Sequence, residues 1–104
     1  MPSELRIEMS MAGSSTLVDL SGYLDHTTVA RLSKAIRTSL NHNTVEVVLD
    51  LGKVAWLDSV AMGQFMMYRQ LLEKKDRKLV LANCKGTLLA ALRLVNFHKL
   101  LEIR

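Results

Sequence analysis

Residues 45–63 read VEVVLDLGKVAWLDSVAMG, and this stretch decides the fold class. Its first part, residues 45–51, is a nearly continuous apolar run rich in β-branched residues, which is typical of a central strand buried on both faces. Asp58 and Ser59 then stand where a helix begins, because their side-chain oxygens can accept hydrogen bonds from the free amides of a first helical turn. The stretch therefore predicts a buried strand that leads through a short segment into a helix.

Regular hydrophobic spacing continues on the C-terminal side. A helix is predicted from Ser59 to about Lys75, because apolar residues recur on one side of it: Ala61, Phe65, Tyr68 and Leu72. Residues 79–82 predict a further core strand. Thr87 is the expected cap of a third helix that ends at Asn96, and residues 100–103 predict a last short strand.

The N-terminal side predicts a hairpin and then a helix. Residues 5–11 roughly alternate apolar and polar side chains, a Gly-Ser-Ser turn follows, and residues 17–20 form the second arm. The next helix has Asp25 or Thr27 as its expected N-cap. The predicted order is β-β-α-β-α-β-α-β, an α/β fold in one domain spanning residues 1–104. Its mixed, mostly parallel sheet of four to five strands is packed by three to four helices.

Composition is typical of a globular domain. With 104 residues, 49% of them hydrophobic, the chain can bury a core without disulfides or metal. Cys84 is the only cysteine, so no intrachain disulfide can form, which suits a reducing compartment. The N-terminus carries Glu4 and Glu8, and no run reaches the ~18 apolar residues of a membrane span. We expect a cytoplasmic protein without direct membrane insertion.

The formal net charge of +4 comes partly from one basic run. Lys74, Lys75, Arg77 and Lys78 fall at a predicted helix end, where cations complement the helix dipole and keep a turn solvated. Nucleic-acid-binding patches usually include aromatic residues or a recognition helix, and neither is evident beside this run. We expect no nucleic-acid partner.

Ser59 is the main candidate for chemistry. Its local interpretation is an N-cap. A second interpretation, compatible with the first, is a phosphate acceptor, because an added phosphate would lie at the positive end of a helix. Catalysis by Ser59 is not expected. Its neighbours do not form G-x-S-x-G, and no histidine has a spacing that ties it to Ser59 as a base: His26, His42 and His98.

No metal site, cofactor site or catalytic residue is expected. One cysteine and three scattered histidines give no metal-ligand spacing, and Gly52-Lys53 lacks the phosphate-loop pattern. Trp56 is interpreted as a core anchor. Met62 and Met66 either fill gaps in the core or form an adaptable apolar patch that a partner covers. We therefore expect a binding module and not an enzyme.

Three segments resemble the STAS domain family, in particular the stand-alone anti-sigma factor antagonists of bacteria. Residues 22–25, GYLD, are similar to the G-x-L-D turn after the family's second strand. Residues 47–51, VVLDL, and 57–63, LDSVAMG, resemble the strand and the D-S-[ST]-G-L-G signature. Residues 78–83, KLVLAN, are similar to the following strand. The resemblance spans nearly the whole chain in the same order.

The resemblance implies partner switching in signal transduction and transcription regulation. In the antagonists, the serine after the signature Asp is phosphorylated by a GHKL-type serine kinase that is also the anti-sigma factor; that position is Ser59 here. The unphosphorylated form binds the kinase, phosphorylation releases it, and a PP2C-type phosphatase removes the phosphate. The implied partner-binding residues are Asp25, His26, Asp58, Ser59, Val60, Ala61, Met62, Gly63 and Met66.

The chain departs from the family pattern at Val60, Ala61, Met62 and Asp76, which replace Ser/Thr, Gly, Leu and Gly. These changes predict a diverged partner surface and a less flexible loop at residue 61. With such a diverged surface, an output of the kinase other than a sigma factor, such as a biofilm or secretion regulator, is also an open expectation. Two alternatives stay open: a non-switching STAS subunit bound to an ATPase, as in ABC-type lipid transport, and an enzyme or nucleotide-binding protein.

Overall fold

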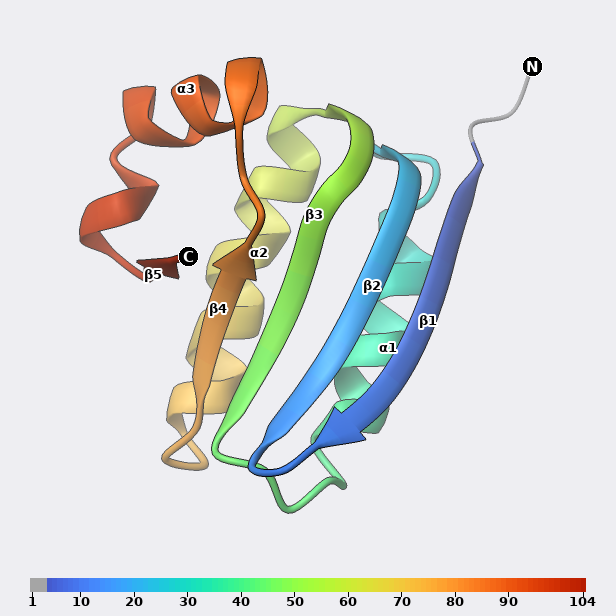
Figure 1. Ribbon diagram of the computed structural model, residues 1–104, viewed down its shortest axis with the longest axis vertical. Helices are drawn as coiled ribbons and strands as arrows, with labels where there is room; N and C mark the ends of the chain where they lie inside the picture. Colours follow the sequence, from blue (N-terminus) through green and yellow to red (C-terminus); the bar gives the residue numbers. More distant parts are fainter. Residues whose placement is uncertain (1–3) are drawn as a thin grey trace.

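The computed structural model describes residues 4–104 as a five-stranded sheet with its two longer helices packed against one face (Figure 1). Along the chain the elements are β1 (Leu5–Ala12), β2 (Ser15–Leu24), α1 (Val29–Ser39), β3 (Glu46–Leu57), α2 (Ser59–Glu73), β4 (Lys78–Ala82), α3 (Gly86–Leu94), the 3₁₀ helix η1 (Phe97–Lys99) and β5 (Glu102–Ile103). This order confirms the predicted β-β-α-β-α-β-α-β fold. The 3₁₀ helix was not predicted.

The strands lie in the sheet in their chain order, β1-β2-β3-β4-β5. The β1–β2 pair is antiparallel, and the pairs β2–β3, β3–β4 and β4–β5 are parallel. A tight hairpin turn can join only antiparallel strands, and each parallel pair requires a crossover. The crossovers contain α1, α2 and α3, so every parallel strand ends at the same edge of the sheet and opens into a loop or helix there.

The core lies between the sheet and helices α1 and α2. Leu49 and Leu81 are fully buried on the helix-facing side of β3 and β4. The predicted apolar stripe of α2 is confirmed, since its four members are at most 1% exposed: Ala61, Phe65, Tyr68 and Leu72. The Tyr68 hydroxyl lies 2.7 Å from Ser33 Oγ of α1, so the one polar atom of this stripe has a partner.

The other face of the sheet carries a network of ion pairs and no helix within the described chain (Figure 1). Glu46 lies 3.1 Å from Arg104, which also contacts Glu102 at 2.6 Å, and Lys78 contacts Glu102 at 2.8 Å. The hydrogen bonds from Arg104 and Ser15 lower the pKa of Glu46 to about 2. The network therefore ties the end of the chain to the centre of the sheet.

Arg77 corrects the interpretation of the basic run as a solvated helix end. Its side chain is buried, and it donates to Thr44 O at 2.6 Å, to Ser39 O at 2.9 Å and to Thr44 Oγ1 at 2.7 Å. Arg77 therefore joins the start of β4 to the loop before β3. Its neighbour Asp76 adopts a φ of 56°, the left-handed conformation that favours glycine, at the position where a glycine was expected.

Two predicted helix starts and one strand end differ from the structure. The N-cap of α1 is Thr28, neither Asp25 nor Thr27, and the N-cap of α3 is Lys85, two residues before Thr87. Strand β3 continues six residues beyond the predicted end, to Leu57. The extension is a less apolar segment that pairs with the C-terminal half of β2, and this pairing between distant segments extended the strand beyond its local pattern.

Candidate functional site

The candidate site lies where β2 and β3 end side by side. Leu24 and Leu57 are paired in register, and the Asp58 amide donates to Leu24 O at 3.2 Å. The turn of residues 25–28 before α1 and the start of α2 therefore meet at the C-terminal edge of the sheet. Parallel pairing explains this meeting, because it brings the ends of both strands to the same edge.

Asp58 holds these two turns together. Its Oδ1 accepts from the Ala61 amide at 3.0 Å, and its Oδ2 accepts from the His26 amide at 2.9 Å, with His26 Nδ1 at 3.4 Å. Desolvation raises the pKa of Asp58, but the two amide donors and the His26 ring outweigh it and hold the pKa below its ordinary value. An ionised carboxylate therefore caps α2.

The hydroxyl of Ser59 is left free because Asp58 caps the helix. Ser59 is the first residue of α2, its side chain is exposed, and within residues 4–104 its hydroxyl has no hydrogen-bond partner. The local interpretation of Ser59 as the N-cap is therefore wrong. The hydroxyl lies at the positive end of a 15-residue helix, where a negative group is favoured.

The nine implied partner-binding residues divide by exposure. Four of these residues are exposed: His26, Ser59, Val60 and Gly63. Three others are half-buried: Asp58, Met62 and Met66. Both methionines pack against the core cluster, as the gap-filling interpretation predicts. Asp25 is 8% exposed and Ala61 is 0% exposed. These two side chains can support a surface at this site but present almost no area to a partner.

Asp25 organises the turn beside the site. Its Oδ1 accepts from the Thr27 amide at 2.9 Å and from the Thr27 hydroxyl at 2.5 Å, and the Asp25 amide donates to Thr28 Oγ1 at 3.0 Å. Side-chain bonds of this kind fix a turn locally. The position of the His26 amide opposite Asp58 therefore depends on Asp25.

Two exposed aromatic residues enlarge the site beyond the residues that the sequence suggested. Trp56 is 59% exposed and pairs in register with Tyr23, which is 47% exposed. The interpretation of Trp56 as a core anchor is therefore wrong. Alternation along the sequence did not indicate this, because Val54 and Leu57 both pack against the core and the register shifts between Val54 and Trp56.

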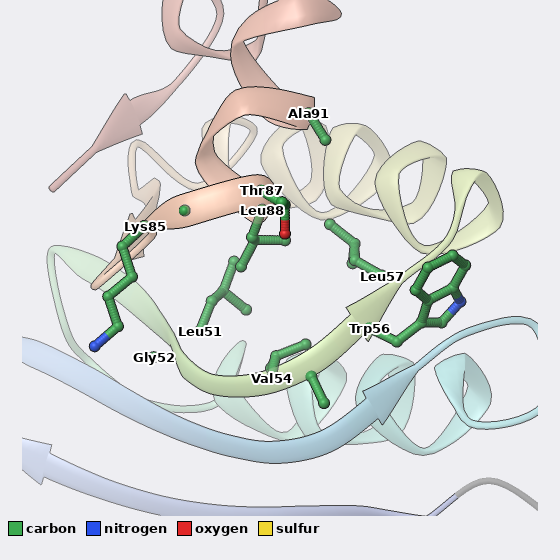
Figure 2. Close-up of a pocket in the computed structure, with 11 residues that line it drawn as sticks. Leu51, Gly52, Val54, Trp56, Leu57, Lys85, Thr87, Leu88 and Ala91 are labelled. Atoms are coloured by element: carbon green, nitrogen blue, oxygen red, sulfur yellow. The ribbon is translucent and has the colours of Figure 1, made fainter.

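A cavity of about 450 Å³ opens next to this surface, between the last part of β3 and the first half of α3 (Figure 2). Trp56 and Leu57 line it on the side of β3, directly before Asp58, and Lys85, Thr87 and Leu88 line it on the side of α3. No motif indicated this cavity, because its walls come from segments that are about 30 residues apart in the sequence.

Cys84 and the other titratable groups do not suggest a reactive centre. Burial, with Asp50 nearby, raises the pKa of the Cys84 thiol to about 11, so the thiol stays protonated near neutral pH.

In the described part of the chain, no three His, Cys, Asp or Glu side chains are grouped as metal ligands. None of the described helices is both long enough and apolar enough to span a membrane.

The chain is similar to a family and to several solved structures. The model of the family described as "Mlab, STAS domain" matches residues 7–102. An anti-sigma factor antagonist from Mycobacterium paratuberculosis shares the fold, with a TM-score of 0.87 and 19% identity over 96% of this chain and 85% of that one. No curated protein matches the chain.

Two structures of SpoIIAA, one unphosphorylated and one phosphorylated, also share the fold of this chain. The unphosphorylated anti-sigma factor antagonist SpoIIAA has a TM-score of 0.75 and 20% identity over 95% of this chain and 87% of that one. The phosphorylated form of the Bacillus protein has a TM-score of 0.72 and 17% identity over 95% and 91%. At such low identities these structures establish the fold and nothing finer.

Proposed function

This chain belongs to the STAS domain family, and from that premise we propose that it is a regulatory binding module controlled by phosphorylation of Ser59. In this proposal it acts in the cytoplasm as an anti-sigma factor antagonist. Its unphosphorylated form binds a GHKL-type serine kinase that is also an anti-sigma factor. Phosphorylation of Ser59 releases that partner, and a PP2C-type phosphatase restores binding. The module itself catalyses nothing.

The observation that carries the proposal is the free, exposed hydroxyl of Ser59. Capping by Asp58 means that a phosphate on Ser59 would replace no hydrogen bond that holds α2. The negative charge would be partly offset by the helix dipole and opposed by the ionised Asp58 carboxylate. We therefore expect the fold to tolerate the phosphate, as a reversible signal requires.

The surface around Ser59 suits a protein partner. Val60 is 45% exposed at the start of α2, and the exposed rings of Tyr23 and Trp56 lie at the ends of the two strands that lead to this edge. Aromatic side chains of this kind are enriched at protein interfaces. The partner is expected to cover these groups and to remove water from Ser59.

Phosphorylation would then act on the bound state much more than on the free protein. It adds −1.5 to −2 charges, and a partner that covers Ser59 must desolvate them. A hundredfold loss of affinity requires only about 2.7 kcal/mol of differential free energy, because each 1.4 kcal/mol is tenfold. One uncompensated phosphate in a contact surface is sufficient for this difference.

Intact mass spectrometry of the protein from its native host, with and without the candidate kinase, tests the modification. We expect a mass gain of one phosphate that maps to Ser59 and disappears in Ser59→Ala. Binding of the kinase is expected to survive Ser59→Ala and to be lost in Ser59→Asp. Ser14→Asp is the matched control, since it adds the same charge at an exposed position in the distant β1–β2 turn. Phosphate at another residue would refute the assignment.

A second candidate function is a non-switching subunit bound to an ATPase, of the ABC lipid transport type. The observation that favours it is the description of the matched family, which names Mlab, whereas the antagonists share only the fold with this chain. Ser59→Asp separates the two candidates. It abolishes partner binding in a switch and weakens it only slightly in a static subunit.

A further inference from the structure

Helix α3 is apolar around most of its circumference but is poorly buried. Six of its nine residues are apolar, and only Leu92 among the nine is buried. A helix of this composition is normally enclosed on several sides. Its first half instead stands over the cavity of about 450 Å³ that separates it from β3 (Figure 2). This volume lies within the range of small-molecule sites.

The cavity walls are mainly hydrophobic with a polar end. Seven of the eleven lining residues have apolar side chains: Leu51, Val54, Ala55, Trp56, Leu57, Leu88 and Ala91. The single ionisable lining residue is Lys85, and Thr87 contributes a hydroxyl. Within residues 4–104, neither the Lys85 ammonium nor the Thr87 hydroxyl has a hydrogen-bond or ion-pair partner.

The polar and aromatic groups are separated along the cavity. Figure 2 shows Lys85 and Trp56 at opposite ends of the lining, with Leu51, Thr87 and Leu88 between them. The Thr87 hydroxyl is directed towards β3. A molecule lying along the cavity would thus meet a cation at one end, one hydroxyl near the middle and hydrocarbon over the rest of its length.

We propose that this cavity binds a small amphipathic carboxylate, a medium-chain aliphatic acid. Its carboxylate would pair with the Lys85 ammonium at one end of the cavity, and its chain would pack against Leu51, Leu57 and Leu88. Charge complementarity selects an anion, because the lining holds one cation and no carboxylate. The apolar walls select a hydrocarbon body, since its burial is the main favourable contribution.

This site is separate from the phosphate acceptor and does not depend on the proposed function. Trp56 and Leu57 form one end of the cavity, whereas the Ser59 hydroxyl does not line it. Trp56 is also the only tryptophan of the chain, so its fluorescence reports the arrival of a ligand without an added label. A chain that fails every phosphorylation test could still bind the acid.

The test is a titration of the full chain with octanoate below its micelle concentration, followed by Trp56 fluorescence. We expect a saturable blue shift, with weaker binding of octanol and weaker binding still of octylammonium. Lys85→Gln is expected to weaken octanoate binding about fivefold, the upper value for an exposed ion pair, and to leave octanol binding unchanged. Lys53→Gln is the matched control, because that exposed lysine lines a different pocket.

A second variant tests whether binding requires the cavity itself, without any change of charge. Ala91→Phe fills part of the cavity and is expected to abolish binding of octanoate and octanol alike, with thermal unfolding confirming that the variant is folded. Amide chemical shifts are expected to change at Leu51, Leu57 and Leu88. Equal binding of the three probes, no effect of either variant, shifts confined to the exposed residues 94–96 and 98–100, or no saturable signal at all would each overturn the proposal.

Discussion

Replacing Asp58 by alanine tests the assignment of Asp58, and not Ser59, as the cap of α2. The substitution removes the acceptor for the Ala61 amide and the acceptor for the His26 amide. Loss of an N-cap costs about 1 kcal/mol, and loss of a second hydrogen bond about 1 kcal/mol more. We therefore expect Asp58→Ala to lower the free energy of unfolding by about 2 kcal/mol. Ser59→Ala should change it by less than about 0.5 kcal/mol, because no hydrogen bond is lost.

Urea and thermal unfolding followed by circular dichroism measure both variants. For a domain of this size, about 2 kcal/mol corresponds to a fall in Tm of roughly 8–12 °C. Asp58→Asn is the matched control, because asparagine caps helices about as well as aspartate and lacks the charge. It should recover about half of the stability lost in Asp58→Ala, because its single side-chain oxygen can accept from the Ala61 amide while its NH2 group cannot accept from the His26 amide.

The reverse ranking would refute the reasoning. If Ser59→Ala cost as much as Asp58→Ala, the Ser59 hydroxyl would be a structural group, and the proposal of a free phosphate acceptor would lose its basis. A cost of Asp58→Ala below about 0.5 kcal/mol would show that the two turns do not depend on this carboxylate.

Four further substitutions test the fold. Gly22→Ala should destabilise by more than about 2 kcal/mol in urea unfolding, because φ is 110° and the new Cβ would lie 2.4 Å from Glu4 O. Asp76→Gly should raise Tm, with a gain of about 1 kcal/mol, since φ is 56° there. Arg77→Met should cost about 3 kcal/mol by leaving its buried acceptors unpaired, and a near-neutral result would contradict this role. The pKa of Glu46 is about 2 in the folded protein, below its ordinary value of 4.5, so its stabilisation is present above pH 4.5 and is lost as pH falls towards 2. Glu46→Gln should flatten that part of a pH series of urea unfolding.

Most of the fold was predictable because its signals are local. The apolar stripe of α2 and the apolar run at residues 45–51 follow from periodicity alone, and Asn96 does end the region of α3 in the left-handed conformation. The burial of Arg77 was not predictable in this way. Its three acceptors belong to residues 39 and 44, more than 30 positions away, and a basic run carries no mark of such partners.

The sequence by itself determined the order of the elements, the single domain and the place of Ser59 at the start of a helix, since periodicity and capping preferences act over a few residues. Only the tertiary structure decided that Asp58 is the cap. While Asp58 Oδ1 accepts from the Ala61 amide, Asp58 Oδ2 accepts from the His26 amide, 32 residues away, which parallel pairing of β2 and β3 brings to the carboxylate. The same pairing turned Trp56 outward, and the placement of α3 left a cavity beside it, because packing between distant segments decides which side chains are covered.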